Sequence, residues 1–404
     1  MKYLVILADG MADFPVPELN GQTPMEVSKK PNIDFLAQNG TVGIAKTVPV
    51  GMPPGSDVAN LAVMGYDPHV YYTGRSPLEA VSIGVELGKN DVAFRCNLVT
   101  LSDEAGYRDK TMVDYSSDEI STAEAAILIN DIAERFRSEI IQFYSGVSYR
   151  HLMVWRGGPE KTNLTPPHDI SDRPIAKYLP AGEGEVELLR LMTESVSVLK
   201  DHPVNQARIQ RGLRPATSLW FWGQGTKPSI TSFFEKYQLK GSVISAVDLA
   251  KGLGICAGLD VIEVPGATGN IHTNFKGKAE AALAAFKAGQ DFVYLHVEAP
   301  DEAGHRGEIE NKVLAIEKID QEILGPILSR LPEIASDFKV LVMPDHPTPL
   351  TLKTHVADPV PFVIYQHLKK AGQYSIEVLT EQTAAATGLV INEGYRLMDR
   401  FILG

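Results

Sequence analysis

Seven side chains that could bind metal ions or attack an electrophile lie after apolar runs of the sequence. They are Asp9, Ser56, Asp301, His305, Asp345, His346 and His355. Carboxylate and imidazole groups are common ligands of divalent metal ions, and a hydroxyl group beside such ions becomes a stronger nucleophile. These residue types predict a pocket for two divalent metal ions around a serine nucleophile. The chemistry that such a pocket predicts is phosphoryl transfer to and from the serine.

The spacing of the acidic and imidazole residues is compatible with two ions. Asp301 and His305 lie four apart in DEAGH, so on a helix they face the same direction and could hold one ion. A pair on a solvated helix face has the same spacing. Asp345 and His346 follow a buried strand, where neighbouring side chains diverge and could reach different ions. His355 lies in the next loop and could complete the first ion's ligands.

Two of the seven residues have simpler interpretations. Ser56 follows Pro54 and Gly55 and begins an apolar-periodic segment, which is typical of a helix N-cap. Beside a metal cluster, the same position would suit a nucleophile, because helix amides stabilise a phosphate group. Asp9 follows a buried strand, where an unpaired carboxylate costs several kcal/mol. Either a bound cation or a helix N-terminus would offset that cost.

The elements that must position these residues are short apolar runs separated by helical stretches. The runs span residues 3–8, 42–48, 242–247, 261–264, 292–297, 339–343 and 361–365. Runs of this kind are typical of buried parallel strands, so we predict an α/β fold with a doubly wound, mostly parallel sheet. Ligands of such sheets bind at the carboxyl ends of the strands. Asp9 ends the first run, His296 and Glu298 end the fifth, and Asp345 follows the sixth.

Between about Gly88 and Pro215 the alternation of strands and helices is interrupted. This stretch contains two strand-like runs (92–101 and 151–155), an Ala-rich helix (121–137) and Pro-rich turns (164–167). We therefore expect residues 88–215 to form a smaller α+β domain inserted into a core domain of residues 1–87 and 216–404. The insert carries many basic and polar residues: Arg95, Asn97, Arg150, His151, His168, Asp169, Arg173, Arg208 and Arg214.

Composition narrows the class of protein. A chain of 404 residues suggests about two domains when one domain has about 150 residues. The net charge of −12 argues against a nucleic-acid or anionic-membrane partner, although a local basic cluster could bind a small anion. Cys96 and Cys256 lie far apart in apolar segments, which favours a reducing cytoplasm over a disulfide framework. Neither a signal-peptide core nor a run of about 20 apolar residues is expected from the sequence.

Five separated motifs carry a family resemblance. They are ILADGMAD (6–13), PGSDVAN (54–60), YTGRSPLE (72–79), HVEAPDEAGH (296–305) and DH (345–346). In this order they closely resemble the archaeal-type cofactor-independent (2,3-bisphosphoglycerate-independent) phosphoglycerate mutases of the alkaline phosphatase superfamily. YRHLMVW, TPPHDISDRP and LWFWGQG extend the likeness through the insert, so it covers nearly the whole chain.

The resemblance implies a role for each of the seven residues. Ser56 matches the phosphorylated nucleophile. Asp9, Ser56, Asp345 and His346 match the ligands of one metal ion, and Asp301, His305 and His355 match those of the other. Manganese is typical of the family, zinc, magnesium or cobalt could substitute, and no 2,3-bisphosphoglycerate is needed.

The resemblance also implies substrate contacts. Arg95, Asn97, Arg150, His151 and Arg173 are candidates to bind the substrate, and His168 or Asp169 is a candidate acid–base residue. Arg75, expected in the core domain beside Ser56, would clamp a phosphate. Arg208 and Arg214 are equally compatible with surface ion pairs.

The implied reaction interconverts 3-phosphoglycerate and 2-phosphoglycerate through a phosphoserine, with the insert acting as a lid over a small phosphorylated hydroxy acid. Three alternatives use the same frame: a homoserine kinase-like phosphotransferase, a metal-dependent phosphohydrolase or sulfohydrolase, and a non-catalytic binding protein. The sequence does not indicate an oligomeric state.

Overall fold

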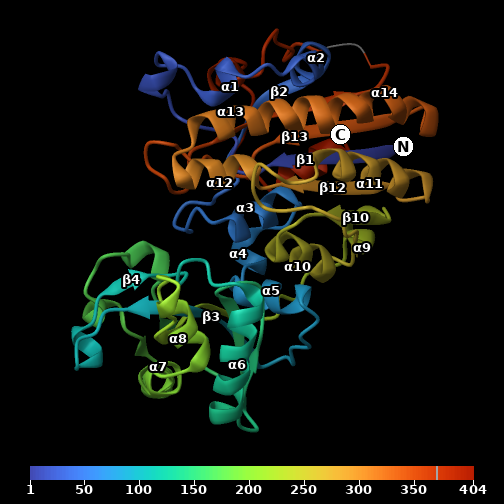
Figure 1. Cartoon of the computed structure of the whole chain (residues 1–404). Coiled ribbons are helices and arrows are strands. Elements are labelled where there is room, and N and C mark those ends of the chain that lie inside the picture. Colours follow the sequence, from blue (N-terminus) through green and yellow to red (C-terminus); the bar gives the residue numbers. More distant parts are fainter. Residues whose placement is uncertain (370–371) are drawn as a thin grey trace. The chain divides into compact units, whose positions relative to one another are not determined.

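The computed structural model describes residues 1–369 and 372–404. The chain divides into two compact units (Figure 1). One, the core unit, comprises residues 1–72 and 229–404, and the other, the second unit, comprises residues 73–228. Each unit has its own hydrophobic core.

An eight-stranded sheet forms the centre of the core unit, in the order β11-β10-β12-β1-β13-β14-β2-β15. Every neighbouring pair is parallel except the two pairs that involve β14. The strands are β1 (Lys2–Ala8), β2 (Thr41–Ala45), β10 (Gly241–Ile244), β11 (Asp260–Val261), β12 (Phe292–Val297), β13 (Phe338–Met343), β14 (Val360–Gln366) and β15 (Val390–Ile391).

Helices cover both faces of this sheet. They are α1 (Pro24–Val27), α2 (Pro31–Asn39), α3 (Ser56–Val63), α4 (Pro68–Tyr71), α9 (Phe233–Tyr237), α10 (Asp248–Cys256), α11 (Phe275–Lys287), α12 (Ala299–Arg306), α13 (Ile309–Lys318), the π-helix η5 (Ile319–Leu324), α14 (Gly325–Ile334), α15 (Glu381–Ala386) and α16 (Arg396–Ile402), with a 3-10 turn η1 (Pro17–Leu19). Among the residues described, no helix has the length and apolar character needed to cross a membrane.

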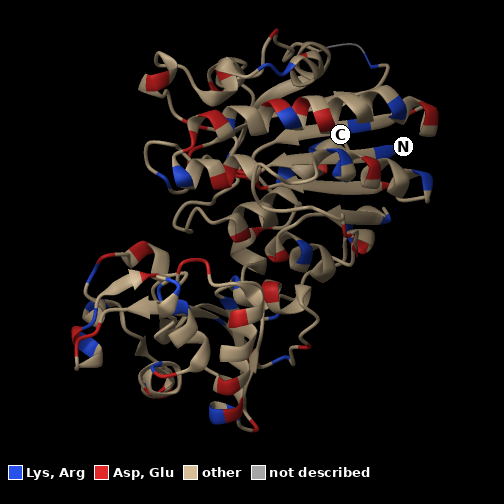
Figure 2. Cartoon of the chain, viewed as in Figure 1, with Lys and Arg blue, Asp and Glu red and all other residues tan. Residues whose placement is uncertain are grey.

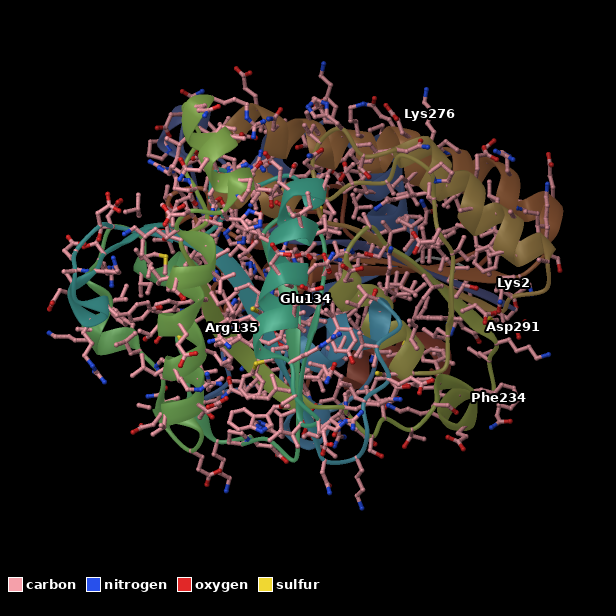
Figure 3. All side chains as sticks on the ribbon, turned by 60° about the horizontal axis from the view of Figure 1, so that its bottom comes forward. Lys2, Glu134, Arg135, Phe234, Lys276 and Asp291 are labelled. Carbon is pink, nitrogen blue, oxygen red and sulfur yellow. The ribbon has the colours of Figure 1, made fainter. Side chains whose placement is uncertain are left out.

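Alternate residues of β1 show that both sheet faces are buried. Leu4 and Ile6 belong to the core cluster that α2, α11, α13 and α14 share, and the last three of these helices lie across the sheet in Figure 1. On the opposite face, Tyr3 packs edge-on against Phe401 of α16, with ring centroids 5.6 Å apart. A surface ion pair of 3.1 Å between Lys2 and Asp291 joins the starts of β1 and β12 (Figure 3). Burial of both faces explains why β1 is a continuous apolar run.

The register of the three central strands determines where the chemical residues gather. In β1, Leu7 pairs with His296 of β12 on one side and with Met343 of β13 on the other. The three parallel strands therefore end at the same edge of the sheet. The segments that leave this edge carry Asp9, Asp301 and Asp345, and acidic residues are visible around α12 there (Figure 2).

The predicted α/β fold with a mostly parallel sheet is confirmed. The run 292–297 coincides with β12, and each of the other core runs overlaps a strand whose ends differ from those of the run by a few residues. The interpretation of the run 361–365 as a parallel strand is wrong, because β14 pairs antiparallel with both of its neighbours. An apolar run indicates that a strand is buried but does not indicate whether it runs parallel or antiparallel to its neighbours.

The second unit is built on an antiparallel sheet in the order β4-β3-β6-β5, with β9 also paired to β3. Residues 125, 128, 129, 132 and 136 of α6 recur at helical spacing and pack on this sheet together with α7. The elements are α5 (Ser76–Ser82), β3 (Asp91–Leu101), η2 (Tyr107–Asp109), β4 (Met112–Asp114), α6 (Thr122–Phe136), β5 (Ile141–Tyr144), β6 (Arg150–Arg156), β7 (Thr162–Asn163), η3 (Pro167–Ile170), η4 (Ile175–Tyr178), β8 (Ala181–Gly182), α7 (Glu185–Leu199), α8 (Pro203–Gln210) and β9 (Ser218–Thr226).

The second unit is wider than the insert of residues 88–215 expected from the sequence. It also includes α5 and β9, because both pack directly against β3. The backbones of the two added segments come very close together. A Cβ atom on Gly225 would lie only 1.8 Å from the carbonyl oxygen of Thr73, and Gly74 has a φ of +120°. Glycine at these two positions permits an approach that no other residue would allow.

Candidate active site

The loop after β1 passes very close to α12. A Cβ atom on Gly10 would lie 2.6 Å from the Cα of Asp301 and 2.6 Å from the Oγ1 of Thr348, and Gly10 has a φ of +62°. Both the space and the backbone conformation therefore require glycine. The close approach brings Asp9 and Asp301 together, although they are far apart in the sequence.

Two groups of potential metal ligands result, and they share Asp301. One group is Asp9, Asp301 and His346, and the other is Asp301, His305 and His355. Within each group, the ligand atoms lie within 4.8 Å of one another. In the second group, the Nε2 atoms of His305 and His355 each lie 3.3 Å from an Asp301 oxygen and 2.8 Å from each other. The shared carboxylate would place two ions side by side.

Ser56 is the first residue of α3 and directs its hydroxyl group into this cluster. Its Oγ lies 3.0 Å from Nε2 of His346, and the residue is 8% exposed. The N-cap of α3 is Gly55, without a side-chain hydrogen bond, so the helix-cap interpretation of Ser56 is wrong. A hydroxyl that is free of a capping role and faces metal ligands has the placement required of a nucleophile.

Asp345 is fully buried behind His346 and accepts several hydrogen bonds. Its Oδ1 accepts from the backbone amides of Gly10 (3.2 Å) and His346 (2.9 Å), and its Oδ2 accepts from Nδ2 of Asn60 (2.9 Å). Oδ2 also lies 3.3 Å from Nε2 of His346. The Asp345 carboxylate therefore lies next to the group of Asp9, Asp301 and His346, and these hydrogen bonds fix its orientation.

The electrostatics of the cluster favour a cation. Burial, and then the negative charges of Asp345 and Asp301, raise the pKa of Asp9 well above its usual value. Its Oδ1 is a buried atom without a hydrogen-bond partner in the described part of the chain. A divalent ion would satisfy this oxygen and neutralise the crowded carboxylates.

The imidazole groups respond to the same charges. Burial opposes ionisation of Asp301, but His355 and His305 outweigh it and lower the pKa of Asp301 well below its usual value. Burial likewise opposes protonation of His305, yet hydrogen bonding to Asp301 raises its pKa to about 9. Burial lowers the pKa of His346, which favours the neutral form that binds metals. Oxygen and nitrogen donors of this kind fit manganese, zinc, magnesium or cobalt.

A second cluster of predicted residues surrounds Trp222 in the second unit. The guanidinium groups of Arg75 and Arg95 lie 5.9 and 5.1 Å from its ring centroid, and its Nε1 donates to Oδ1 of Asn97 at 3.0 Å. Glu79 pairs with both arginines. Burial lowers the pKa of Arg95 only to about 10, so it remains cationic at neutral pH. Its buried Nε has no hydrogen-bond partner in the described residues.

Arg75 belongs to the second unit, so the expectation that it lies in the core domain is wrong. The helix that follows it, α5, packs on β3 and β9 of the second unit. The motif YTGRSPLE therefore crosses from one unit to the other. A continuous sequence motif gives no indication of such a boundary.

The other predicted substrate-binding and acid–base residues of the second unit do not all lie near Trp222. The His168 ring stands edge-on to Trp222, with ring centroids 5.2 Å apart. Its Nε2 lies 3.7 Å from Oδ1 of the exposed Asp169. Arg150 pairs in register with Asn97, whereas His151 pairs with the core residue Cys96 and so lies on the opposite face of the sheet. Burial lowers the pKa of His151 to about 3, so it is neutral. Arg173 is exposed.

Arg208 and Arg214 have structural partners. Arg208 is buried, pairs with Glu124 at 2.9 Å and donates to backbone carbonyls. Arg214 pairs with Asp114 and Asp118, each at 3.3 Å. These contacts account for both arginines without a substrate.

Known proteins with similar sequences share one description. Residues 37–205 match a family model described as 2,3-bisphosphoglycerate-independent phosphoglycerate mutase. A Geobacter sulfurreducens protein named "Probable 2,3-bisphosphoglycerate-independent phosphoglycerate mutase" is 52% identical over 402 residues, covering 100% of both chains. A Methanosarcina barkeri protein named "2,3-bisphosphoglycerate-independent phosphoglycerate mutase" is 49% identical, covering 96% of this chain and 97% of its own. The chain belongs to this mutase family.

A solved structure agrees with the assignment to the mutase family. The cofactor-independent phosphoglycerate mutase from Thermoplasma acidophilum has a TM-score of 0.62 and 27% identity, with 99% of both chains covered. The similarity spans both units. The match therefore includes the residues of the core unit and those of the second unit.

Several residues that support the candidate site are not predicted from the sequence. Thr348 donates from Oγ1 to Oδ1 of Asp301 at 2.5 Å and lies 3.3 Å from Nδ1 of His346. Lys312 of α13 is fully buried and forms a 2.7 Å ion pair with Asp13. It also donates to the carbonyl oxygens of Ala12 and Thr348, joining the loops after β1 and β13. No motif marks Lys312, because a lysine on a helix is ordinarily exposed.

Replacing Lys312 by Met is expected to lower the free energy of unfolding by about 3–5 kcal/mol, because Asp13 would be left buried without its cation. Lys318→Met on the same helix is the matched control. Lys318 pairs with Glu322 at a partly exposed position, and its loss should cost less than about 1 kcal/mol. Urea titration followed by circular dichroism measures both. Equal losses in the two variants would contradict the supporting role of Lys312.

Proposed function

We propose that the protein interconverts 3-phosphoglycerate and 2-phosphoglycerate, without 2,3-bisphosphoglycerate, through a phosphoserine on Ser56. The observation that carries the proposal is the 3.0 Å approach of the Ser56 hydroxyl to His346 within a cluster of potential metal ligands. The substrate is suggested by relatives of about 50% identity that carry the mutase name. The alignments with these relatives cover 96–100% of the chain and therefore include both units.

The arrangement fits two divalent metal ions, manganese first, with zinc, magnesium or cobalt as substitutes. Asp9, Ser56, Asp345 and His346 would hold one ion, and Asp301, His305 and His355 the other, with Asp301 also close enough to reach the first ion. When bound, such ions lower the pKa of a serine hydroxyl and offset the negative charge of the phosphoryl oxygens. Both effects favour attack by Ser56.

The proposed reaction has two phosphoryl transfers. In the first, the Ser56 hydroxyl group loses its proton, and its Oγ forms a bond to the phosphorus atom as the bond to the C3 oxygen of the substrate breaks. The C3 oxygen takes a proton. Glycerate then turns. Its C2 hydroxyl group loses a proton as its oxygen attacks the phosphoserine, and the Oγ of Ser56 leaves and regains a proton. Reversal of these steps gives the opposite reaction.

We assign binding of the glycerate carboxylate and phosphate to the second unit. Arg75 and Arg95 offer cationic groups, and Asn97, Arg150 and Arg173 are further candidates. His151 is not among them, because it is buried on the opposite face of the sheet. His168 or Asp169 would exchange the proton between C2 and C3 oxygens. Retention of glycerate requires an enclosed cavity, and the second unit would act as its lid. Otherwise water would hydrolyse the phosphoserine, and the protein would be a phosphatase.

A paired assay tests this function. One reaction contains 3-phosphoglycerate alone, and the other contains homoserine with ATP, each with manganese. We expect 2-phosphoglycerate to form in the first reaction, with little free phosphate, and no phosphohomoserine in the second. Both are followed by phosphorus NMR. Turnover only with homoserine and ATP, or release of phosphate faster than isomerisation, would overturn the proposal.

A further inference from the structure

A chain of hydrogen bonds reaches the Oδ2 atom of Asp9, whereas His346 lies near its Oδ1 atom. His296, near the end of β12, is buried, and its Nε2 lies 2.8 Å from Oδ2 of Asp9. Its Nδ1 lies 3.0 Å from Oγ of Ser245, which in turn accepts a 3.0 Å hydrogen bond from the amide of Val247. The reaction steps proposed above do not use His296 or Ser245.

The direction of each hydrogen bond follows from the groups that meet. A bound cation would keep Asp9 ionised, and an ionised carboxylate can only accept, so Nε2 of His296 must then carry the proton. With one proton on the neutral ring, Nδ1 is an acceptor and takes the hydroxyl proton of Ser245. The chain therefore runs from the Val247 amide through Ser245 and His296 to Oδ2 of Asp9, and every donor has an acceptor.

This arrangement distinguishes the two oxygens of Asp9. Oδ2 is engaged by His296, whereas Oδ1 has no hydrogen-bond partner among the described residues and lies 3.6 Å from Nε2 of His346. Oδ1 is therefore the oxygen available to an ion in the group that contains Asp301 and His346. If the carboxylate rotated, both oxygens would compete for that ion and for the histidine.

The backbone of His296 is also fixed. His296 pairs with Leu7 in the sheet, and its carbonyl oxygen accepts a 2.8 Å hydrogen bond from the buried Nζ of Lys278 on α11. The ring is thus held by its backbone from one side and by Ser245 from the other. A rigid donor of this kind fixes the carboxylate geometry before an ion binds.

We propose that His296, held by Ser245, is a positioning residue that fixes the Asp9 carboxylate and thereby raises the affinity of one of the two metal sites. The inference rests on the two-ion site of the proposed function. Loss of a hydrogen bond to a ligating group typically weakens metal binding about 10-fold to 100-fold. The effect should be confined to the ion that Asp9 would hold.

The test is titration of the metal-free full-length protein with manganese, without substrate, followed by calorimetry and by the electron paramagnetic resonance of free manganese. His296→Asn places its amide near the position of Nδ1, too far from Asp9, so one site should weaken about 10-fold to 100-fold. His296→Gln places an N–H near the position of Nε2 and should retain more of the affinity. The other site should be unchanged in both variants.

Ser245→Ala provides a second variant that leaves the ring in place. It should weaken the same site by a smaller factor. Ser242→Ala is the matched control, because Ser242 lies in the adjoining strand β10 and its buried hydroxyl has no hydrogen-bond partner among the described residues. This control should bind manganese as the unaltered protein does.

The outcomes separate the inference from the proposed function. If the unaltered protein binds two ions and His296→Asn binds both equally well, the positioning role of His296 is refuted while the two-ion site stands. Equal weakening in Ser242→Ala and Ser245→Ala would also refute it. If the unaltered protein binds no manganese or other divalent ion, the two-ion proposal fails, and the role of His296 fails with it.

Discussion

Replacing Ser56 by Ala is expected to abolish the interconversion of 3-phosphoglycerate and 2-phosphoglycerate, with a rate loss of about 10⁴-fold or more. The variant lacks the oxygen that would receive the phosphoryl group. Among the contacts of the described residues, the Ser56 hydroxyl group is the only hydroxyl group at Nε2 of His346. The fold should be unaffected, because the Ser56 side chain does not cap α3. Phosphorus NMR measures the rate, and thermal denaturation measures the stability.

Ser232→Ala is the matched control for this experiment. Ser232 is the N-cap of α9 and accepts a 3.1 Å hydrogen bond from the amide of Glu235. Its loss should lower the stability by about 0.5–2 kcal/mol and leave turnover unchanged. The two serines therefore have opposite expected effects. Substantial mutase activity in Ser56→Ala would remove the covalent mechanism.

The second large effect is expected from removal of the metal ions. Dialysis against a chelator should lower turnover by about 10³-fold or more, since metal ions contribute several kcal/mol to stabilisation of a transition state. It should also lower the melting temperature, because Asp9, Asp301 and Asp345 would be crowded without a cation. Added manganese should restore both quantities. Elemental analysis before and after dialysis gives the number of ions bound.

A pair of variants on α12 tests the same site by mutation. Asp301 belongs to both groups of potential ligands, so Asp301→Asn should lower the affinity for both ions. Glu302→Gln is the control, because the neighbouring Glu302 pairs with Arg306 at the surface. It should bind manganese normally. Full activity of the stripped protein, or normal manganese binding by Asp301→Asn, would contradict the two-ion site.

The sequence predicts most of the core unit because its strands are buried on both faces. Such strands appear as apolar runs, and chemical residues that follow them meet at one edge of a parallel sheet. This rule predicts that Asp9, Asp301 and Asp345 lie close together. The sharing of Asp301 between two groups could not be predicted, because it depends on the close approach at Gly10.

The second unit was less predictable, since its limits depend on contacts distant in the sequence. β9 pairs with β3 across more than a hundred residues, and α5 joins the same unit. Neither fact leaves a local pattern. Trp222, whose ring lies at the centre of the cationic cluster, is likewise indistinguishable in sequence from Trp220 two residues earlier, and both belong to the core of the second unit.

Supporting residues were missed for a different reason. The role of Lys312 comes from complete burial beside Asp13, and the role of His296 comes from its partners on two other segments. Their residue types are compatible with many positions in a protein. Only coordinates show which atoms they contact.

The most direct test of the central claim is to detect the phosphorylated residue during turnover. The metal-loaded protein is mixed with 3-phosphoglycerate, quenched in acid within milliseconds and digested for peptide mass spectrometry. We expect a phosphoryl group on Ser56 that disappears in Ser56→Ala. A phosphoryl group on another residue, or an unmodified Ser56 in protein that is turning over at full rate, would contradict the account.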